Sequence, residues 1–163
     1  MSAQSATIPS FPARSAWPAR AALAAVLALI ALLSLQQIRD TDYWWHWTLG
    51  KTIAQSGIPA EETFMLTRQG VPTFSLSWGY CLALFHLERT IGASGVVILK
   101  ALFVVATWSL VWAIARRRAG PITSAWATLI AAIIASQRFT ARPEIITYFL
   151  FAATLFILDT ANF

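Results

Sequence analysis

Residues 40–47 hold the side chains of this chain that are best suited to chemistry. Asp40 and Asp42 are two carboxylates one residue apart, and His46 follows Asp42 by four residues. In a helix, this spacing places Asp42 and His46 on one face, one turn apart. Carboxylates and an imidazole suit either a divalent cation or a general base with its partner. A structural role is the alternative, in which Asp42 caps the following helix and Asp40 pairs with Arg39.

The composition indicates that these residues belong to an integral membrane protein. Of the 163 residues, 58% are hydrophobic and only 12% are charged, whereas soluble domains carry about 25% charged residues. The net charge of +5 comes from basic residues scattered between apolar runs, with one cluster at residues 116–118. That distribution is typical of a topology signal and argues against a nucleic-acid partner. The single cysteine, Cys81, excludes an intramolecular disulfide.

Apolar runs predict an all-α, polytopic membrane bundle that occupies residues 20–163 and follows a flexible cytoplasmic tail at residues 1–19. Four transmembrane helices are predicted, at about residues 20–38, 96–115, 122–137 and 143–159. The first run also resembles a signal peptide, but no small-x-small cleavage pattern follows it, which favours an uncleaved span. The arginines at 116–118 directly follow the second span and belong on the cytoplasmic side. The N-terminus is therefore predicted to be cytoplasmic, in a multi-pass protein.

This topology predicts that the long loop 39–95 is external. A loop of this length is usually functional or disordered, and its many tryptophans argue against disorder. Interfacial helices are predicted at about 43–56 and 77–90. On the first, Trp45, Leu49 and Ile53 share one face, and His46 and Gly50 lie off it. The second is too short to cross the bilayer and is expected to end near Gly92; if it did cross, the arginine triplet would lie outside.

The string Asp-x-Asp-x-Trp-Trp-His, with the downstream Gly50, Gly57-Ile58-Pro59, Phe64 and Trp78, resembles the N-terminal part of bacterial GT-C-fold membrane proteins. That superfamily includes protein O-mannosyltransferases and lipid A aminoarabinose transferases. The resemblance covers the chain from Arg20 onward. The sequence departs from the pattern at Glu62, where an Asp is usual, and at Ser77, where an acidic residue is expected.

The resemblance implies a glycosyltransferase that moves a sugar from a polyprenyl-phosphate donor to an acceptor on the outer face of the bacterial cytoplasmic membrane. Asp42 is the first candidate for the general base and Asp40 the second. The cations expected to bind the donor phosphate are Lys100, Arg138 and Arg142. The expected substrate or interface residues are Trp44, Trp45, His46, Glu62 and Trp78. A divalent metal, Mg²⁺ or Mn²⁺, shared by Asp40, Asp42 and His46 is the alternative to a metal-free base.

Four spans are few for enclosing a donor and an acceptor, so the chain is expected to be the N-terminal portion of a longer transferase or to need a partner subunit.

Two further classes of function compete with the glycosyltransferase interpretation. The second candidate after the glycosyltransferase is a non-enzymatic membrane subunit whose Trp-rich loop docks a partner, since the aromatic content of the loop suits an interface. A transporter or channel fragment would use Lys100 as its pore-lining charge, but the sequence lacks paired intramembrane charges and inverted repeats.

Overall fold

The structure is a computed structural model that describes residues 17–38 and 40–161. Its elements are α1 (Trp17–Ser34), α2 (Thr41–Ser56), η1 (Leu66–Arg68), α3 (Trp78–Ala115), α4 (Pro121–Ala135), η2 (Ser136–Arg138) and α5 (Glu144–Thr160). The described residues contain no strand, only an isolated antiparallel bridge between Glu61 and Pro72. The predicted all-α class is confirmed. Most of the predicted tail lies outside the described residues, and its last three residues, 17–19, are already the first turn of α1.

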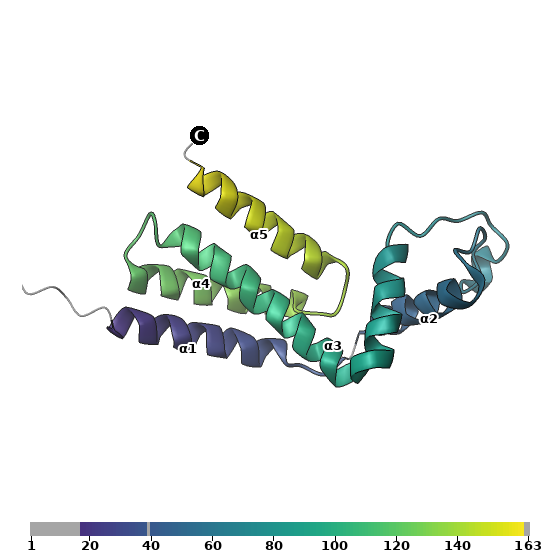
Figure 1. The fold of residues 1–163 in the computed structure, drawn as a ribbon, viewed down its shortest axis with the longest axis horizontal. Helices are drawn as coiled ribbons and strands as arrows, with labels where there is room; N and C mark the ends of the chain where they lie inside the picture. The colour runs from purple at the N-terminus through teal and green to yellow at the C-terminus, as the bar shows by residue number, and fades with distance from the viewer. Residues whose placement is uncertain (1–16, 39, 162–163) are drawn as a thin grey trace, which may run out of the picture.

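The helices form two regions that meet at the bend of α3. α1, α4, α5 and the C-terminal part of α3 lie alongside one another in an elongated bundle, while α2 and the N-terminal part of α3 lie together at one end of it (Figure 1). The core of the bundle is built from apolar side chains of all four helices and of the segment before α5, namely Val26, Ile30, Val104, Ala125, Ala132, Phe139 and Ile145. The second region packs around Tyr43, Leu49, Ile53, Cys81 and Leu84.

Two helices of the bundle are candidates for crossing a membrane. Among the described residues, α1 and α3 are long and apolar enough to cross a bilayer. Large apolar side chains also cover the outside of the bundle: Leu32 is 67% exposed, Ile134 78% and Phe151 65%. Water would disfavour so much exposed apolar surface, whereas lipid would not. α4 and α5 have 15 and 17 residues, which gives helix lengths of about 22 and 26 Å at 1.5 Å per residue. Both lengths are shorter than the hydrocarbon core of a bilayer, which is about 30 Å thick.

Gly92 allows one helix to serve both regions. Its backbone adopts φ 72° and ψ 170° inside α3, a conformation that is essentially restricted to glycine. The part of α3 before Gly92 is therefore steeply inclined to the part after it (Figure 1). The predicted helix 77–90 and the predicted span 96–115 are thus the two arms of α3. The bend holds the first arm against α2, beside the acidic segment.

Candidate active site

Asp40, not Asp42, caps α2. The Oδ1 atom of Asp40 accepts a hydrogen bond from the backbone N–H of Asp42 at 3.1 Å, and Asp40 has the extended backbone of an N-cap residue. The alternative that Asp42 caps the helix is therefore wrong. The suggested pairing of Asp40 with Arg39 falls outside the described residues, because Arg39 is not among them. Asp42 lies in the first turn, where its side chain is 51% exposed and available for another role.

Arg142 joins the two carboxylates from the far end of the sequence. Its Nε and Nη2 atoms donate to the two carboxylate oxygens of Asp40, with 2.9 Å from Nη2 to Oδ1. The same Nη2 lies 2.9 Å from Oδ2 of Asp42. The two-pronged contact with Asp40 matches the planar guanidinium fork, which a lysine does not reproduce. The segment between η2 and α5 is thereby fastened to the start of α2.

The two carboxylates differ in what they remain free to do. Hydrogen bonds from Arg142 hold the pKa of Asp40 below its usual value, and the same contacts raise the pKa of Arg142. Asp40 has a largely buried side chain and engages both carboxylate oxygens. Asp42 is the more exposed of the pair and contacts Arg142 through Oδ2 alone among the described residues. Asp42 is therefore the better placed of the two to accept a proton from a substrate.

His46 is buried between α2 and α3. The imidazole is 9% exposed, and its Nδ1 lies 3.3 Å from the Sγ atom of Cys81 on α3. The rings of Trp45 and Tyr80 pack edge to face against the imidazole, with distances between ring centroids of 4.9 and 5.3 Å. Burial is the main cause of a lowered pKa at His46, which favours the neutral imidazole.

As arranged, Asp40, Asp42 and His46 do not form a metal-ligand set. Arg142 occupies the two carboxylates, and Cys81 faces one nitrogen of the imidazole. In the part of the chain that the structure describes, no group of three metal-ligating side chains converges on one point. The divalent-metal alternative would require this arrangement to open, and it stays a prediction.

Two of the three predicted phosphate-binding cations come together. Arg138 and Arg142 line one cavity of about 230 Å³ with the polar side chains of Gln137, Thr140, Glu144 and Tyr148. Several of these groups are hydrogen-bond donors suited to phosphate oxygens. Lys100 lies elsewhere: it is buried, donates from Nζ to the carbonyl oxygen of Gln36 at 3.3 Å, and borders a separate, mostly apolar cavity. The structure therefore groups Arg138 with Arg142 and leaves Lys100 apart.

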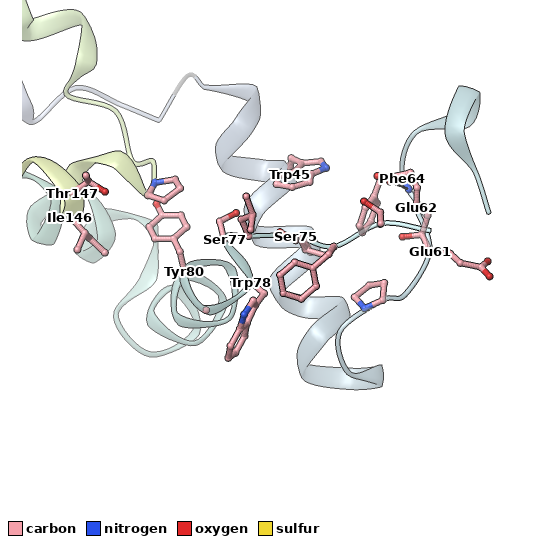
Figure 2. A pocket seen from close by; sticks show the side chains of 18 residues that line it. Trp45, Glu61, Glu62, Phe64, Ser75, Ser77, Trp78, Tyr80, Ile146 and Thr147 are labelled. Carbon is pink, nitrogen blue, oxygen red and sulfur yellow. Dashed lines mark hydrogen bonds between the residues drawn. The ribbon is translucent and has the colours of Figure 1, made fainter. Parts of the chain in front are cut away.

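A larger cavity of about 750 Å³ lies between α2, the loop before α3 and the start of α5. Figure 2 shows the aromatic rings of Trp45, Phe64 and Trp78 around it, with Ile146 and Thr147 at the end opposite Glu61 and Glu62. The indole Nε1 of Trp45 is buried and has no hydrogen-bond acceptor among the described residues. The aromatic rings offer flat apolar surface to an occupant of the cavity.

The remaining predicted contact residues divide between the cavity and the surface. Trp45, Glu62 and Trp78 line the 750 Å³ cavity, whereas Trp44 is 52% exposed and does not line it. Glu62 also has a structural role, because its Oε1 accepts the backbone N–H groups of Phe64 and Met65 at 2.8 and 3.2 Å. These two hydrogen bonds lower the pKa of Glu62 and fix the turn that forms the cavity wall.

Tyr80 is a site residue that the sequence reasoning missed. Its hydroxyl donates to the backbone carbonyl of Ala141 at 2.7 Å, directly before Arg142. Tyr80 thus holds the segment that presents Arg142, and its ring lines the larger cavity. The available signal was a tyrosine in a short apolar helix, since a buried tyrosine hydroxyl usually finds a partner.

The start of α5 separates the two cavities and presents residues to both. Arg142 and Glu144 line the smaller cavity, whereas Pro143, Ile146 and Thr147 line the larger one. A molecule bound across this point would have an anionic part near the arginines and an apolar or hydroxyl-bearing part near the aromatic rings.

No family model, no curated protein and no solved structure matches this chain.

Proposed function

We propose that this chain carries the donor-binding and base-bearing part of a membrane glycosyltransferase that uses a polyprenyl-phosphate sugar. The observation that carries the proposal is the position of Arg142, which contacts Asp40 and Asp42 and also lines the cavity shared with Arg138. A glycosyl transfer from a phosphate donor needs cations for the leaving phosphate and a carboxylate base within reach of the same sugar. Arg142 is common to both requirements.

The proposed membrane arrangement places this site on the outer side of the bacterial cytoplasmic membrane. α1, the arm of α3 after Gly92, α4 with η2, and α5 would form four spans. The arginines at 116–118 end the second span, and Asp159 near the end of α5 pairs with two of them, Arg117 and Arg118. The ends of α3 and α5, which carry these residues, lie at the opposite end of the bundle from α2 (Figure 1). With the arginines in the cytoplasm, as positive charges near spans favour, Asp42 and Arg142 face outward.

The proposed reaction uses Asp42 as the general base. An acceptor hydroxyl attacks the anomeric carbon from the side opposite the phosphate, and its proton passes to the carboxylate of Asp42. The new C–O bond forms as the bond from the anomeric carbon to the phosphate oxygen breaks, so the configuration inverts. The leaving polyprenyl phosphate keeps the electron pair, and Arg138 and Arg142 stabilise its negative charge. Asp40 keeps Arg142 in position, and the 750 Å³ cavity accommodates the acceptor.

The Asp42→Asn variant tests the proposal in native membranes that contain the full-length gene product. We expect sugar transfer from the polyprenyl-phosphate donor to fall by at least about 100-fold, because an amide cannot accept the proton. Insertion should be normal, since the amide oxygen keeps a hydrogen bond with Arg142. Transfer is measured with radiolabelled donor at matched protein levels. Asp159→Asn, at the other end of the bundle, is the matched control, and wild-type transfer by Asp42→Asn would remove Asp42 from the catalytic role.

A non-enzymatic docking role is the second candidate, and exposed apolar side chains of the loop favour it. Leu66 is 89% exposed, Phe74 64% and Leu76 92%. Such side chains suit a partner protein or the remaining spans of a longer chain. Under this alternative, Leu66→Asn with Leu76→Asn would release the partner during purification, and Asp42→Asn would leave the complex intact.

A further inference from the structure

A separate cavity lies at the end of the bundle farthest from α2. It has a volume of about 820 Å³ and is lined by the start of α1, the end of α3 and the start of α4. Figure 1 shows these three segments together at one end of the bundle, with α2 at the other. The cavity therefore has no part in the proposed transfer reaction. Its position at the end of the apolar helices would place it at the level of lipid headgroups.

Two arginines from different helices give this cavity its charge. Arg20 on α1 and Arg116 at the end of α3 both line it, and neither forms an ion pair with a carboxylate among the described residues. Arg117 and Arg118, the neighbours of Arg116, are instead paired with Asp159. The positive charge of this end of the bundle is thus left uncompensated at the cavity, where an anion would compensate it.

Trp112 forms part of the wall of the same cavity. The guanidinium of Arg116 lies over the indole ring of Trp112, with its Cζ 4.9 Å from the ring centroid. This stacking holds the side chain of Arg116 in place and leaves the N–H groups of the guanidinium able to donate hydrogen bonds. Leu23 and the half-exposed Ile122 continue the cavity wall with apolar surface. An occupant with phosphate oxygens and an apolar tail would pair with the arginines and cover the apolar wall of the cavity.

We propose that this cavity is a binding site for the headgroup of an anionic phospholipid, with Arg20 and Arg116 on its phosphate and its acyl chains along α1 and α4. A lipid accounts for the apolar wall as well as for the arginines, whereas free phosphate accounts for the arginines alone. The proposal does not depend on sugar transfer, because none of its residues belongs to the site of Asp42 and Arg142.

The test measures lipid binding to the full-length protein in detergent by native mass spectrometry, with phosphatidylglycerol and phosphatidylcholine as probes. We expect the wild type to bind phosphatidylglycerol about tenfold more tightly than phosphatidylcholine, and the Arg20→Gln/Arg116→Gln variant to lose this preference. Arg20→Lys/Arg116→Lys should recover part of it. The matched control is Arg68→Gln/Arg89→Gln, which removes the same charge from exposed positions in the other region and should keep the preference.

Three results would overturn the proposal: no preference in the wild type, equal loss of preference in the Arg68/Arg89 control, or displacement of phosphatidylglycerol by inorganic phosphate at equal concentration. The last result would identify a free-phosphate site instead. A melting temperature equal to that of the wild type is the folding control for each variant. Loss of lipid preference with intact sugar transfer would separate this site from the proposed active site.

Discussion

The Arg142→Gln variant is expected to lose about 2 kcal/mol of stability and at least about 100-fold in sugar transfer. Arg142 makes both ion pairs that bind the segment before α5 to the start of α2. Removing the guanidinium leaves the largely buried carboxylate of Asp40 without its cation, which costs more than a surface pair would. Stability is measured by thermal unfolding in detergent, and transfer with the labelled polyprenyl-phosphate donor.

Arg138→Gln is the matched control for this prediction. Arg138 lines the same cavity as Arg142 but forms no ion pair with Asp40 or Asp42. We expect the Arg138 variant to raise the KM for the donor and to leave the melting temperature within about 1 °C of the wild type. Equal destabilisation by both variants, or full transfer by Arg142→Gln, would contradict the role assigned to Arg142.

The pH dependence of stability provides a second readout of the same contact. The pKa of Asp40 lies below its usual value of 3.8 because Arg142 stabilises the charged form. The unfolded chain therefore binds this proton at a higher pH than the folded protein does. The stabilisation is present above about pH 4 and is lost as the pH falls through the lower pKa of the folded state. The wild type should lose this increment on acidification, and Arg142→Gln should not.

The Gly50→Ala variant is expected to lose about 3 kcal/mol or more and to fail to assemble the region around α2. A Cβ atom at position 50 would lie 2.0 Å from the backbone carbonyl oxygen of Cys81 and 3.0 Å from the Cβ of Phe85. The backbone of α3 cannot move aside without disturbing the contact between Cys81 and His46. Because Asp40 and Asp42 lie on the start of the same helix, we expect transfer to fall with stability.

Gly79→Ala is the matched control for Gly50→Ala. Gly79 lies on α3, near the same contact, but a Cβ atom there would have no neighbour within 4 Å. Alanine also favours helix over glycine by about 1 kcal/mol, so this variant should be as stable as the wild type or more so. Thermal unfolding of both variants distinguishes a steric effect from a general effect of adding a methyl group. A stable Gly50→Ala protein would mean that α2 and α3 are not packed this closely.

The elements of the fold were largely predictable because they depend on local sequence. Long apolar runs predict α1 and the second arm of α3, and Gly92 marks the place where the chain turns. The predicted boundaries differ by a few residues at most helix ends, as local signals usually allow. Leu49 and Ile53 lie on the buried face of α2, but the prediction that His46 and Gly50 lie off this face is wrong, because both are buried with them. Hydrophobic periodicity cannot identify a buried histidine whose partner is a thiol, or a glycine selected by the close approach of another helix.

The contacts of the candidate site depend on residues that are distant in sequence, and a single sequence does not reveal them. Arg142 is 102 residues from Asp40, and Lys100 is 64 residues from Gln36. The sequence identified Asp40, Asp42, Arg138 and Arg142 by residue type and by their expected depth in the membrane. The structure brings Arg142 into contact with both Asp40 and Asp42. The sequence could not distinguish Lys100, whose hydrogen bond is to a backbone carbonyl that no side-chain pattern encodes.

The most direct test of the central proposal is the position at which the donor lipid binds. Full-length protein in native membranes would be photolabelled with a polyprenyl phosphate that carries a diazirine next to the phosphate, and the labelled peptides would be identified by mass spectrometry. We expect labels within residues 136–148 and 40–47, with loss of labelling in an Arg138→Gln/Arg142→Gln variant and no loss in Arg68→Gln/Arg89→Gln. Labelling confined to other segments, or equal labelling of the Arg138/Arg142 variant, would contradict a donor site at Arg142.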